Sequence, residues 1–294
     1  MLKNKSAHTA ILIANIIFGL NYVFSKMLVP DYMSPMATTV ARVIFAVIAF
    51  WAIAMIGKYR KIEKRDLLRF FILGQLGVSL NMYLFLKGIS FTSPMDSSII
   101  MTLTPLLVLI TSAIVLKEVV TKHKIFGIIL GATGAILLIA SSGVYGTYGP
   151  NQWWGNILTF ASSLSYSVYL VLAKPLMEKY GPFTVLRWVF TFGAVALIPI
   201  GCMDFVQTNW SAFDSKGVGL LAFMLIGATL ITYLCISHGL SKVRPTTVSI
   251  YNYSQPVIAS LLTVFLGIDR LSPQLLFCAA LVFSGVYLVV RGKK

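Results

Sequence analysis

Charged side chains are scarce in this 294-residue sequence. Lys, Arg, Asp and Glu together make up 11% of it, whereas soluble globular domains carry about 25%. Hydrophobic residues make up 57%, and the mean hydropathy is +0.85. Too little polar surface is available to cover a water-soluble body of this size, so we expect an integral membrane protein.

Histidine, cysteine and carboxylate residues are also few. The three histidines, His8, His123 and His238, stand apart with no partner at ligand spacing. The three cysteines form neither a CxxC motif nor a disulfide pattern. None of the nine Asp and Glu residues lies near the middle of an apolar run. The sequence therefore lacks the reactive constellation of a membrane enzyme, and we expect no catalytic residue, metal or cofactor.

Long apolar runs are what the sequence has instead. Each is close to the roughly 20 residues that a helix needs to cross a bilayer, and the alternating pattern of a β-barrel is absent. The sequence predicts an all-α integral membrane protein without a soluble domain. We predict ten transmembrane helices, at residues 9–29, 36–56, 68–86, 94–115, 124–142, 153–173, 183–202, 217–236, 246–266 and 273–290.

The positions of the basic residues predict the orientation. With the N-terminus in the cytoplasm, 18 of the 24 Lys and Arg residues fall on the inner side, including a cluster at residues 58–69. This is the positive-inside bias, and an even number of spans then places both termini in the cytoplasm. We expect a multi-pass protein of the cell (inner) membrane. The net charge of +15 is thus topological and does not indicate a nucleic-acid partner.

The two halves of the sequence resemble each other. Residues 88–105 match residues 239–256 at a constant offset of 151, with a glycine, a serine and two prolines in register. Each half then holds five spans, an odd number, so the second half enters the membrane from the opposite side. We predict a first repeat at 1–142, an outer linker at 143–152 and an inverted second repeat at 153–294. Inverted repeats are typical of secondary transporters, with the substrate site between the repeats near the midplane.

The same segments carry a resemblance to a known family. "SPMDSSIIMTLTPLLVLI" (93–110) and "RPTTVSIYNYSQPVIASLL" (244–262) each contain a mid-helix proline, and a short acidic turn comes after each, at Glu118 and Asp269. They resemble the drug/metabolite transporter superfamily, EamA-like family. The Gly-Glu pair of that family is incomplete here, because Lys117 precedes Glu118. The resemblance implies a ten-helix transporter over nearly the whole chain, and it implies no particular substrate.

Polar side chains at helical spacing predict a central cavity. They recur three or four residues apart on the first, third, sixth, eighth and ninth spans. Tyrosines would supply apolar walls, and amides would supply donors and acceptors; the alternative is hydrogen bonding between helices. The predicted substrate-binding residues are Asn15, Tyr22, Gln75, Ser79, Tyr83, Tyr166, Tyr169, Tyr233, Ser249, Tyr251, Asn252 and Gln255.

Two basic residues and two prolines complete the candidates. Arg42, deep in the second span, either contacts a substrate carboxylate or, as the favoured interpretation, caps carbonyls of a neighbouring helix or snorkels. Lys26, at the outer end of a polar stripe, either guides substrate or anchors its helix at the interface. Pro105 and Pro256 should kink their helices, and the kinks either flex during gating or shape packing.

These observations favour a secondary transporter that exports a small polar or zwitterionic metabolite, such as an amino acid, by alternating access. The alternatives are a multidrug or lipophilic-cation exporter and, from other classes, a channel or an integral-membrane enzyme. The lack of a midplane carboxylate argues against the cation exporter. Gly127, Gly131 and Gly134 should form a close-packing seam that serves packing within each repeat, a dimer contact being the other option. We expect a monomer or weak homodimer whose partners are the substrate and the lipid bilayer.

Overall fold

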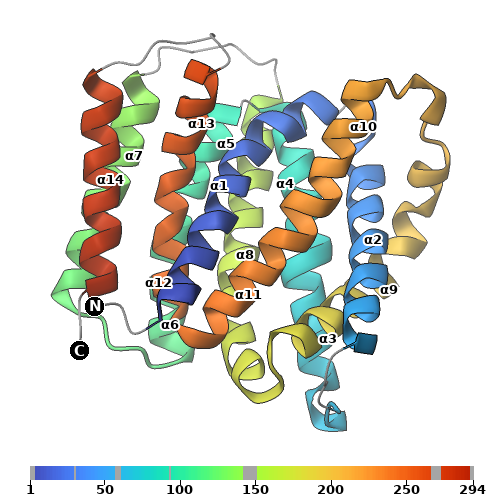
Figure 1. Ribbon diagram of the computed structural model, residues 1–294, viewed down its shortest axis with the longest axis horizontal. Coiled ribbons are helices and arrows are strands. Elements are labelled where there is room, and N and C mark those ends of the chain that lie inside the picture. Colours follow the sequence, from blue (N-terminus) through green and yellow to red (C-terminus); the bar gives the residue numbers. More distant parts are fainter. Residues whose placement is uncertain are drawn as a thin grey trace.

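The computed structural model describes residues 4–29, 31–56, 61–92, 94–141, 151–265 and 273–291. These residues form a bundle of helices without a strand (Figure 1). The helices are α1 (Lys5–Leu28), α2 (Pro35–Ile56), α3 (Leu67–Gly74), α4 (Leu80–Phe91), α5 (Pro94–Met101), α6 (Thr104–Val115), α7 (Lys122–Ser141), α8 (Gln152–Tyr180), α9 (Pro182–Val206), α10 (Ser215–Ala222), α11 (Thr232–Lys242), α12 (Pro245–Ser249), α13 (Ser254–Phe265) and α14 (Pro273–Arg291).

Two of the long helices contain a π-helical segment. Gln75–Ser79 joins α3 to α4, and Phe223–Ile231 joins α10 to α11. Shorter 3-10 turns lie at Lys64–Asp66, Trp210–Ala212 and Ile250–Tyr253. A π turn holds an extra residue, and such turns are frequent at functional sites.

Among the described residues, six helices are long and apolar enough to cross a membrane: Lys5–Leu28, Pro35–Met55, Lys64–Phe91, Gln152–Tyr180, Pro182–Val206 and Ser215–Lys242. They contain or overlap six of the predicted spans, so the prediction of an all-α membrane protein is confirmed. The other four predicted spans also fall on helices, namely α5 with α6, α7, α12 with α13, and α14. That these four cross the bilayer stays a prediction.

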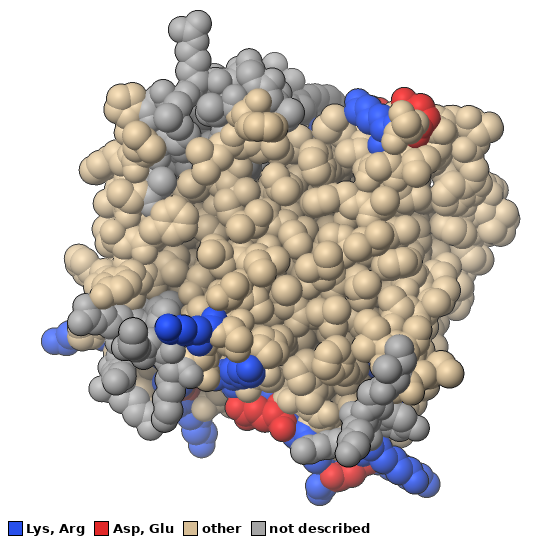
Figure 2. Space-filling view, viewed as in Figure 1, with Lys and Arg blue, Asp and Glu red and all other residues tan. Residues whose placement is uncertain are grey.

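The surface has the pattern expected of a protein in a bilayer. On the face shown in Figure 2, the charged side chains that the structure describes gather at the lower end and in one group at the upper right, and the band between holds none. Large apolar side chains point outward, among them Met55 (85% exposed), Ile114 (73%) and Ile200 (72%). In water this exposure would be unfavourable, whereas lipid chains can cover it.

Helix boundaries recur along the chain at the offset of the predicted repeat. α4 ends at Phe91 and α11 ends at Lys242, while α5 begins at Pro94 and α12 begins at Pro245. The π segment Gln75–Ser79, moved by the same offset, falls inside the second π segment. These coincidences support the predicted duplication, whose residue limits stay a prediction.

Pro105 and Pro256 lie near the start of new helices, after an interruption. Pro105 is in the first turn of α6, directly after the break between α5 and α6. Pro256 is in the first turn of α13, after the 3-10 segment Ile250–Tyr253. Proline is tolerated there because its missing N–H would have no partner within the helix in any case. The expected kinks therefore take the form of helix breaks.

The glycine seam of α7 packs against the second half of the chain. A Cβ atom on Gly127 would lie 2.8 Å from the carbonyl oxygen of Gly285, and one on Gly134 would lie 2.9 Å from that of Cys278; both partners belong to α14. A Cβ on Gly131 would meet the ring of Tyr253. The expectation that this seam serves packing within each repeat is wrong, because small residues bring α7 of the first half together with α14 of the second (Figure 1).

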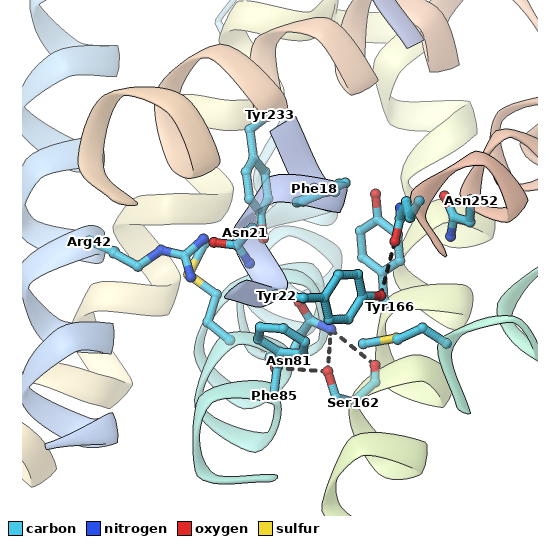
Figure 3. Close-up of a pocket in the computed structure, with 13 residues that line it drawn as sticks. Phe18, Asn21, Tyr22, Arg42, Asn81, Phe85, Ser162, Tyr166, Tyr233 and Asn252 are labelled. Carbon is cyan, nitrogen blue, oxygen red and sulfur yellow. Dashed lines mark hydrogen bonds between the residues drawn. The ribbon is translucent and has the colours of Figure 1, made fainter. Parts of the chain in front are cut away.

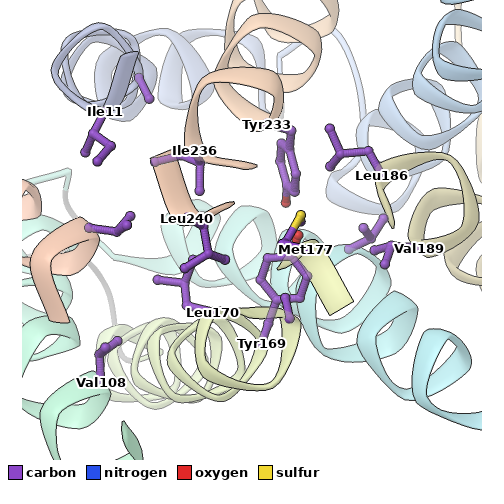
Figure 4. Packing of buried hydrophobic residues seen from close by; sticks show 14 of the residues in the cluster. Ile11, Val108, Tyr169, Leu170, Met177, Leu186, Val189, Tyr233, Ile236 and Leu240 are labelled. Atoms are coloured by element: carbon purple, nitrogen blue, oxygen red, sulfur yellow. The ribbon is translucent and has the colours of Figure 1, made fainter. Parts of the chain in front are cut away.

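The core is built from both halves of the chain. Leu170 of α8, Leu240 of α11 and Val189 of α9 are fully buried and belong to one cluster (Figure 4). Ile11 of α1 and Val108 of α6 extend this cluster toward the other helices. This core holds α1, α8 and α11 in the centre of the bundle, where polar side chains of several helices meet.

Candidate functional site

A cavity lies in the middle of the bundle (Figure 3). Its empty volume is about 560 Å³, including the part open to solvent. Helices of both halves contribute to it, together with the 3-10 segment after α12. The lining residues are Phe18, Asn21, Tyr22, Arg42, Asn81, Met82, Phe85, Met101, Ser162, Tyr166, Tyr233, Asn252 and Gln255.

Gln255 is fixed by two residues of α1. Its Oε1 accepts a hydrogen bond from Tyr22 Oη (3.0 Å), and its Nε2 donates to Asn15 Oδ1 (2.8 Å). Asn15 in turn donates to the carbonyl of Ile11. Tyr22 and Gln255 line the cavity, whereas Asn15 is fully buried and outside the lining. Its role is to orient the Gln255 amide.

Asn81 and Ser162 form a second polar pair across α4 and α8. Asn81 Nδ2 donates to both Ser162 O and Ser162 Oγ at 3.0 Å, and Ser162 Oγ donates back to Asn81 O (Figure 3). Asn81 lines the cavity, and no described residue donates a hydrogen bond to its Oδ1. Neither residue is among the predicted substrate-binding residues, although Ser162 lies on the polar stripe of the sixth predicted span.

The π segment explains why Asn81 was missed. Gln75, Ser79 and Tyr83 form a stripe only if the helix is regular, but the extra residue of the π turn rotates the next turns of the helix by about 100°. Gln75 Nε2 donates to Phe192 O and Ser79 Oγ donates to Gly193 O, both in α9. These two residues join helices, as the alternative interpretation has it, and half-buried Tyr83 is outside the lining.

Aromatic rings form the apolar wall of the cavity. Tyr22 meets Phe85 edge to face at 5.7 Å between ring centroids, and Phe18 meets Tyr166 edge to face at 6.5 Å. Tyr169 stacks behind Tyr166 at 6.1 Å and lies outside the lining. Spacing from the predicted Tyr22 could have indicated Phe18, four residues earlier, whereas Phe85 is four residues from Asn81, which the π turn concealed. The sequence prediction contained neither ring.

The two π segments also supply carbonyl acceptors at the cavity. Tyr233 Oη donates to the carbonyl of Gly77 (2.7 Å) in the first segment. Arg42 Nη2 donates to the carbonyl of Ala228 (3.1 Å) in the second, and Arg42 Nε donates to Thr229 Oγ1 (2.8 Å). Each segment is thus joined to a residue of the other half. Arg42 caps a carbonyl, as the favoured interpretation has it, and it also lines the cavity; its contact with a substrate carboxylate stays a prediction.

In the 3-10 turn at Ile250–Tyr253, the neighbouring candidate residues Tyr251 and Asn252 have different surroundings. Asn252 lines the cavity (Figure 3). Tyr251 lies outside the lining, and its Oη is 2.9 Å from His8 Nδ1 at the start of α1. Ser249 Oγ donates to the carbonyl of Thr246 and also lies outside the lining.

Lys26 lies away from the cavity lining. Its Nζ donates to the carbonyls of Ile89 (2.9 Å) and Ser90 (3.4 Å), at the end of α4, and to that of Thr92 (3.1 Å). These bonds give partners to carbonyls at the end of α4, where intrahelical donors are missing. A cation is also electrostatically favourable at a helix C-terminus. This arrangement favours the anchoring role over substrate guidance.

Among the described residues, the cavity lining contains amides, aromatic rings and one cation. No carboxylate belongs to the described lining, whose charged member is Arg42. Within the described ranges, no group of three or more His, Cys, Asp or Glu side chains could hold a metal ion. The arrangement can therefore hold a small molecule by amide hydrogen bonds, ring contacts and one positive charge.

Comparison with known proteins places the chain in a family. The EamA-like transporter family matches the chain twice, over residues 5–140 and over residues 153–291. An uncharacterized transporter of Archaeoglobus fulgidus is 29% identical, covering 88% of this chain and 90% of its own. A WAT1-related protein of Arabidopsis thaliana is 26% identical, covering 94% and 80%. A solved crystal structure at 18% identity superposes with a TM-score of 0.74, covering 97% of this chain and 96% of that one, and it shows the same fold.

These matches confirm the resemblance to the drug/metabolite transporter superfamily. Two separate stretches match the same family, and together they cover most of the chain. The chain is therefore a multi-pass membrane protein of the EamA-like transporter family.

Proposed function

We propose that this protein is a secondary transporter that exports a small polar or zwitterionic metabolite, such as an amino acid, by alternating access. The observation that carries the proposal is the central cavity, which combines aromatic walls with the amides of Asn21, Asn81, Asn252 and Gln255. Amides offer both donors and acceptors, so they suit a neutral or zwitterionic solute better than a purely apolar one.

Broken helices beside the cavity support the alternating-access part of the proposal. Met101 is the last residue of α5, and Asn252 lies in the interruption between α12 and α13. Both line the cavity. Discontinuous helices at the substrate site are a recurring feature of transporters with inverted repeats. On this view, Pro105 and Pro256 keep the two breaks in place while the helices on either side move.

The charge distribution supports the proposed orientation. Lys5 begins α1 and Arg291 ends α14, at the lower end of Figure 1, where α2 ends and α3 begins. That end carries most of the charged groups visible in Figure 2. With the positive-inside bias, we place this end in the cytoplasm and the protein in the cell membrane. We keep the expectation of a monomer or weak homodimer.

A metabolite screen tests the proposed function. Intracellular and exported metabolite pools are compared by mass spectrometry in cells that produce the protein and in cells that do not. The purified protein is then reconstituted in liposomes with the metabolites that differ. We expect saturable flux and acceleration by the same solute on the opposite side, which a carrier shows. Flux no faster than in protein-free liposomes would exclude transport of these solutes, and flux without saturation would indicate a channel.

A further inference from the structure

Arg42 is a buried cation at the wall of the cavity. Its position lies about 10 Å along α2 from Pro35, at 1.5 Å per residue, and the residue is 3% exposed. A guanidinium group remains charged in proteins. Burying that charge in a span is strongly unfavourable unless partners compensate for it.

The partners of Arg42 hold two of its three nitrogens. Nε donates to Thr229 Oγ1 and Nη2 donates to the carbonyl of Ala228. Thr229 Oγ1 donates onward to the carbonyl of Met224, an acceptor five residues earlier in the π segment. In the part of the chain that the structure describes, no hydrogen bond engages Nη1 and no carboxylate forms an ion pair with Arg42. Figure 3 shows the guanidinium directed toward Asn21, on the cavity side.

The oxygens that accept hydrogen bonds from Arg42 are neutral, so the positive charge of the guanidinium is not balanced by them. Carbonyl and hydroxyl oxygens fix the direction of the guanidinium but carry no negative charge. A carboxylate is the group that complements the remaining N–H donors, because two of its oxygens can accept parallel hydrogen bonds. A cation in the same place would be repelled, and water screens that repulsion little inside the bundle.

We propose that the transported solute carries a carboxylate, which binds the Nη1 side of Arg42. This inference rests on the proposed transport function and names its substrate class. One guanidinium among neutral amides balances a single negative charge, which favours a carboxylate over a phosphate ester. The rest of the solute lies between the ring of Tyr166 and the amides of Asn81 and Asn252. Lipophilic cations, the substrates of the alternative exporter, are disfavoured by the same charge.

Matched pairs of probes test the proposal in proteoliposomes. One mixture holds the twenty standard amino acids, and the other holds the corresponding C-terminal amides, which lack the carboxylate. Uptake is followed by mass spectrometry for the wild type and for Arg42→Gln. We expect the wild type to prefer at least one acid over its amide by about tenfold, equivalent to about 1.4 kcal/mol. Arg42→Gln should abolish that preference.

Two further variants control for folding and for charge. Arg187→Gln removes another arginine that is buried in a span, where it stacks on Trp51 at 4.6 Å and lies outside the cavity lining. It should keep the preference. Thr229→Val keeps the charge of Arg42 but removes the acceptor of Nε, so the guanidinium can turn away from the cavity. It should reduce the ratio of acid to amide by about threefold or more.

The outcomes separate the inference from the proposed function. Transport of amides as fast as acids, or a preference that survives in Arg42→Gln, would overturn the inference and leave transport intact. If Arg42→Gln does not fold, as judged by gel filtration, an unchanged ratio in Thr229→Val overturns it instead. If no probe of either mixture enters faster than into protein-free liposomes, proposed transport of amino acids fails, and the inference fails with it.

Discussion

Met101 and Asn252 are 151 residues apart, the offset of the predicted repeat, and both line the central cavity beside a helix break. One half thus places a thioether at this position and the other half places an amide. A similar difference separates Thr104, which hydrogen-bonds Ser163 of α8, from Gln255, which hydrogen-bonds Asn15 and Tyr22 of α1. The breaks are common to both halves, and both halves also supply polar groups to the site, with two amides from each.

Asn252→Leu should weaken binding of the transported solute. The substitution keeps the side-chain size but removes both the donor and the acceptor from the cavity wall, so we expect an apparent KM about tenfold higher, as for a lost hydrogen bond to a charged or polar ligand. Concentration-dependent uptake in proteoliposomes measures it. The neighbouring Tyr251→Phe is the matched control, because Tyr251 faces His8 outside the lining, and its KM should stay within about twofold. Equal effects of the two changes would contradict the assignment.

Lys26→Met should lower stability. Lys174 of α8 is the corresponding lysine of the second half, since its Nζ donates to the carbonyls of Leu240 (2.9 Å) and Ser241 (3.4 Å) at the end of α11. Loss of such a capping cation should reduce the free energy of unfolding by about 1–2 kcal/mol, given its partial exposure. Thermal unfolding in detergent checks this. Lys216→Met, at an exposed position of α10, should leave the unfolding temperature unchanged, and an equal shift in both variants would exclude a capping effect.

Gly285→Ala should separate α7 from α14. The new Cβ would lie 2.6 Å from the carbonyl oxygen of Gly127 and 2.7 Å from the backbone N of Gly131, so backbone must move. We expect a loss of about 1–3 kcal/mol, typical of overpacking. Gly219→Ala in α10 is the opposite control, because nothing lies within 4 Å of its Cβ position, and alanine should stabilise that helix by about 0.5–1 kcal/mol. Denaturant titration of both variants measures the difference, and a neutral Gly285→Ala would argue against close packing.

Asp214 should make stability depend on pH in the acid range. Its Oδ1 accepts from the backbone N–H of Gly217 (2.7 Å), capping α10, and from Tyr32 Oη (2.9 Å). The backbone hydrogen bond first, and the Tyr32 hydroxyl second, lower the pKa of this carboxyl. Because the folded pKa is below the unfolded one, the contribution is complete above the unfolded value, about 3.9, and is lost as pH falls through the folded pKa. Asp214→Asn should lose this part of the pH dependence.

The Asp214 comparison is made by unfolding wild type and Asp214→Asn between pH 3 and pH 7. The difference in unfolding temperature should be largest near neutral pH and should shrink toward pH 3. A difference that stays constant over this range would show that protonation of Asp214 is not the cause. Tyr32→Phe, which keeps the bond from Gly217, should retain most of the effect.

The sequence by itself determined the class of the protein and the places of its helices. The length of an apolar run is sufficient to predict a membrane-spanning helix, so the six described helices that can cross a membrane coincide with predicted spans. Pro105 and Pro256 marked where helices break, because a missing N–H acts locally. The motifs around them were sufficient to indicate the family.

Only the tertiary structure decided which polar residues face the cavity. Extrapolation at 3.6 residues per turn failed across Gln75–Ser79, where the π turn rotates Asn81 toward the cavity and leaves Tyr83 outside it. In the same way, the 3-10 turn turns Asn252 inward and Tyr251 toward His8. Both segments contact distant helices, with Ser79 bonded to Gly193 of α9 and Tyr251 to His8 of α1. Periodicity within one helix contains no information about those partners, so the residues that line the cavity could be identified only from the tertiary structure.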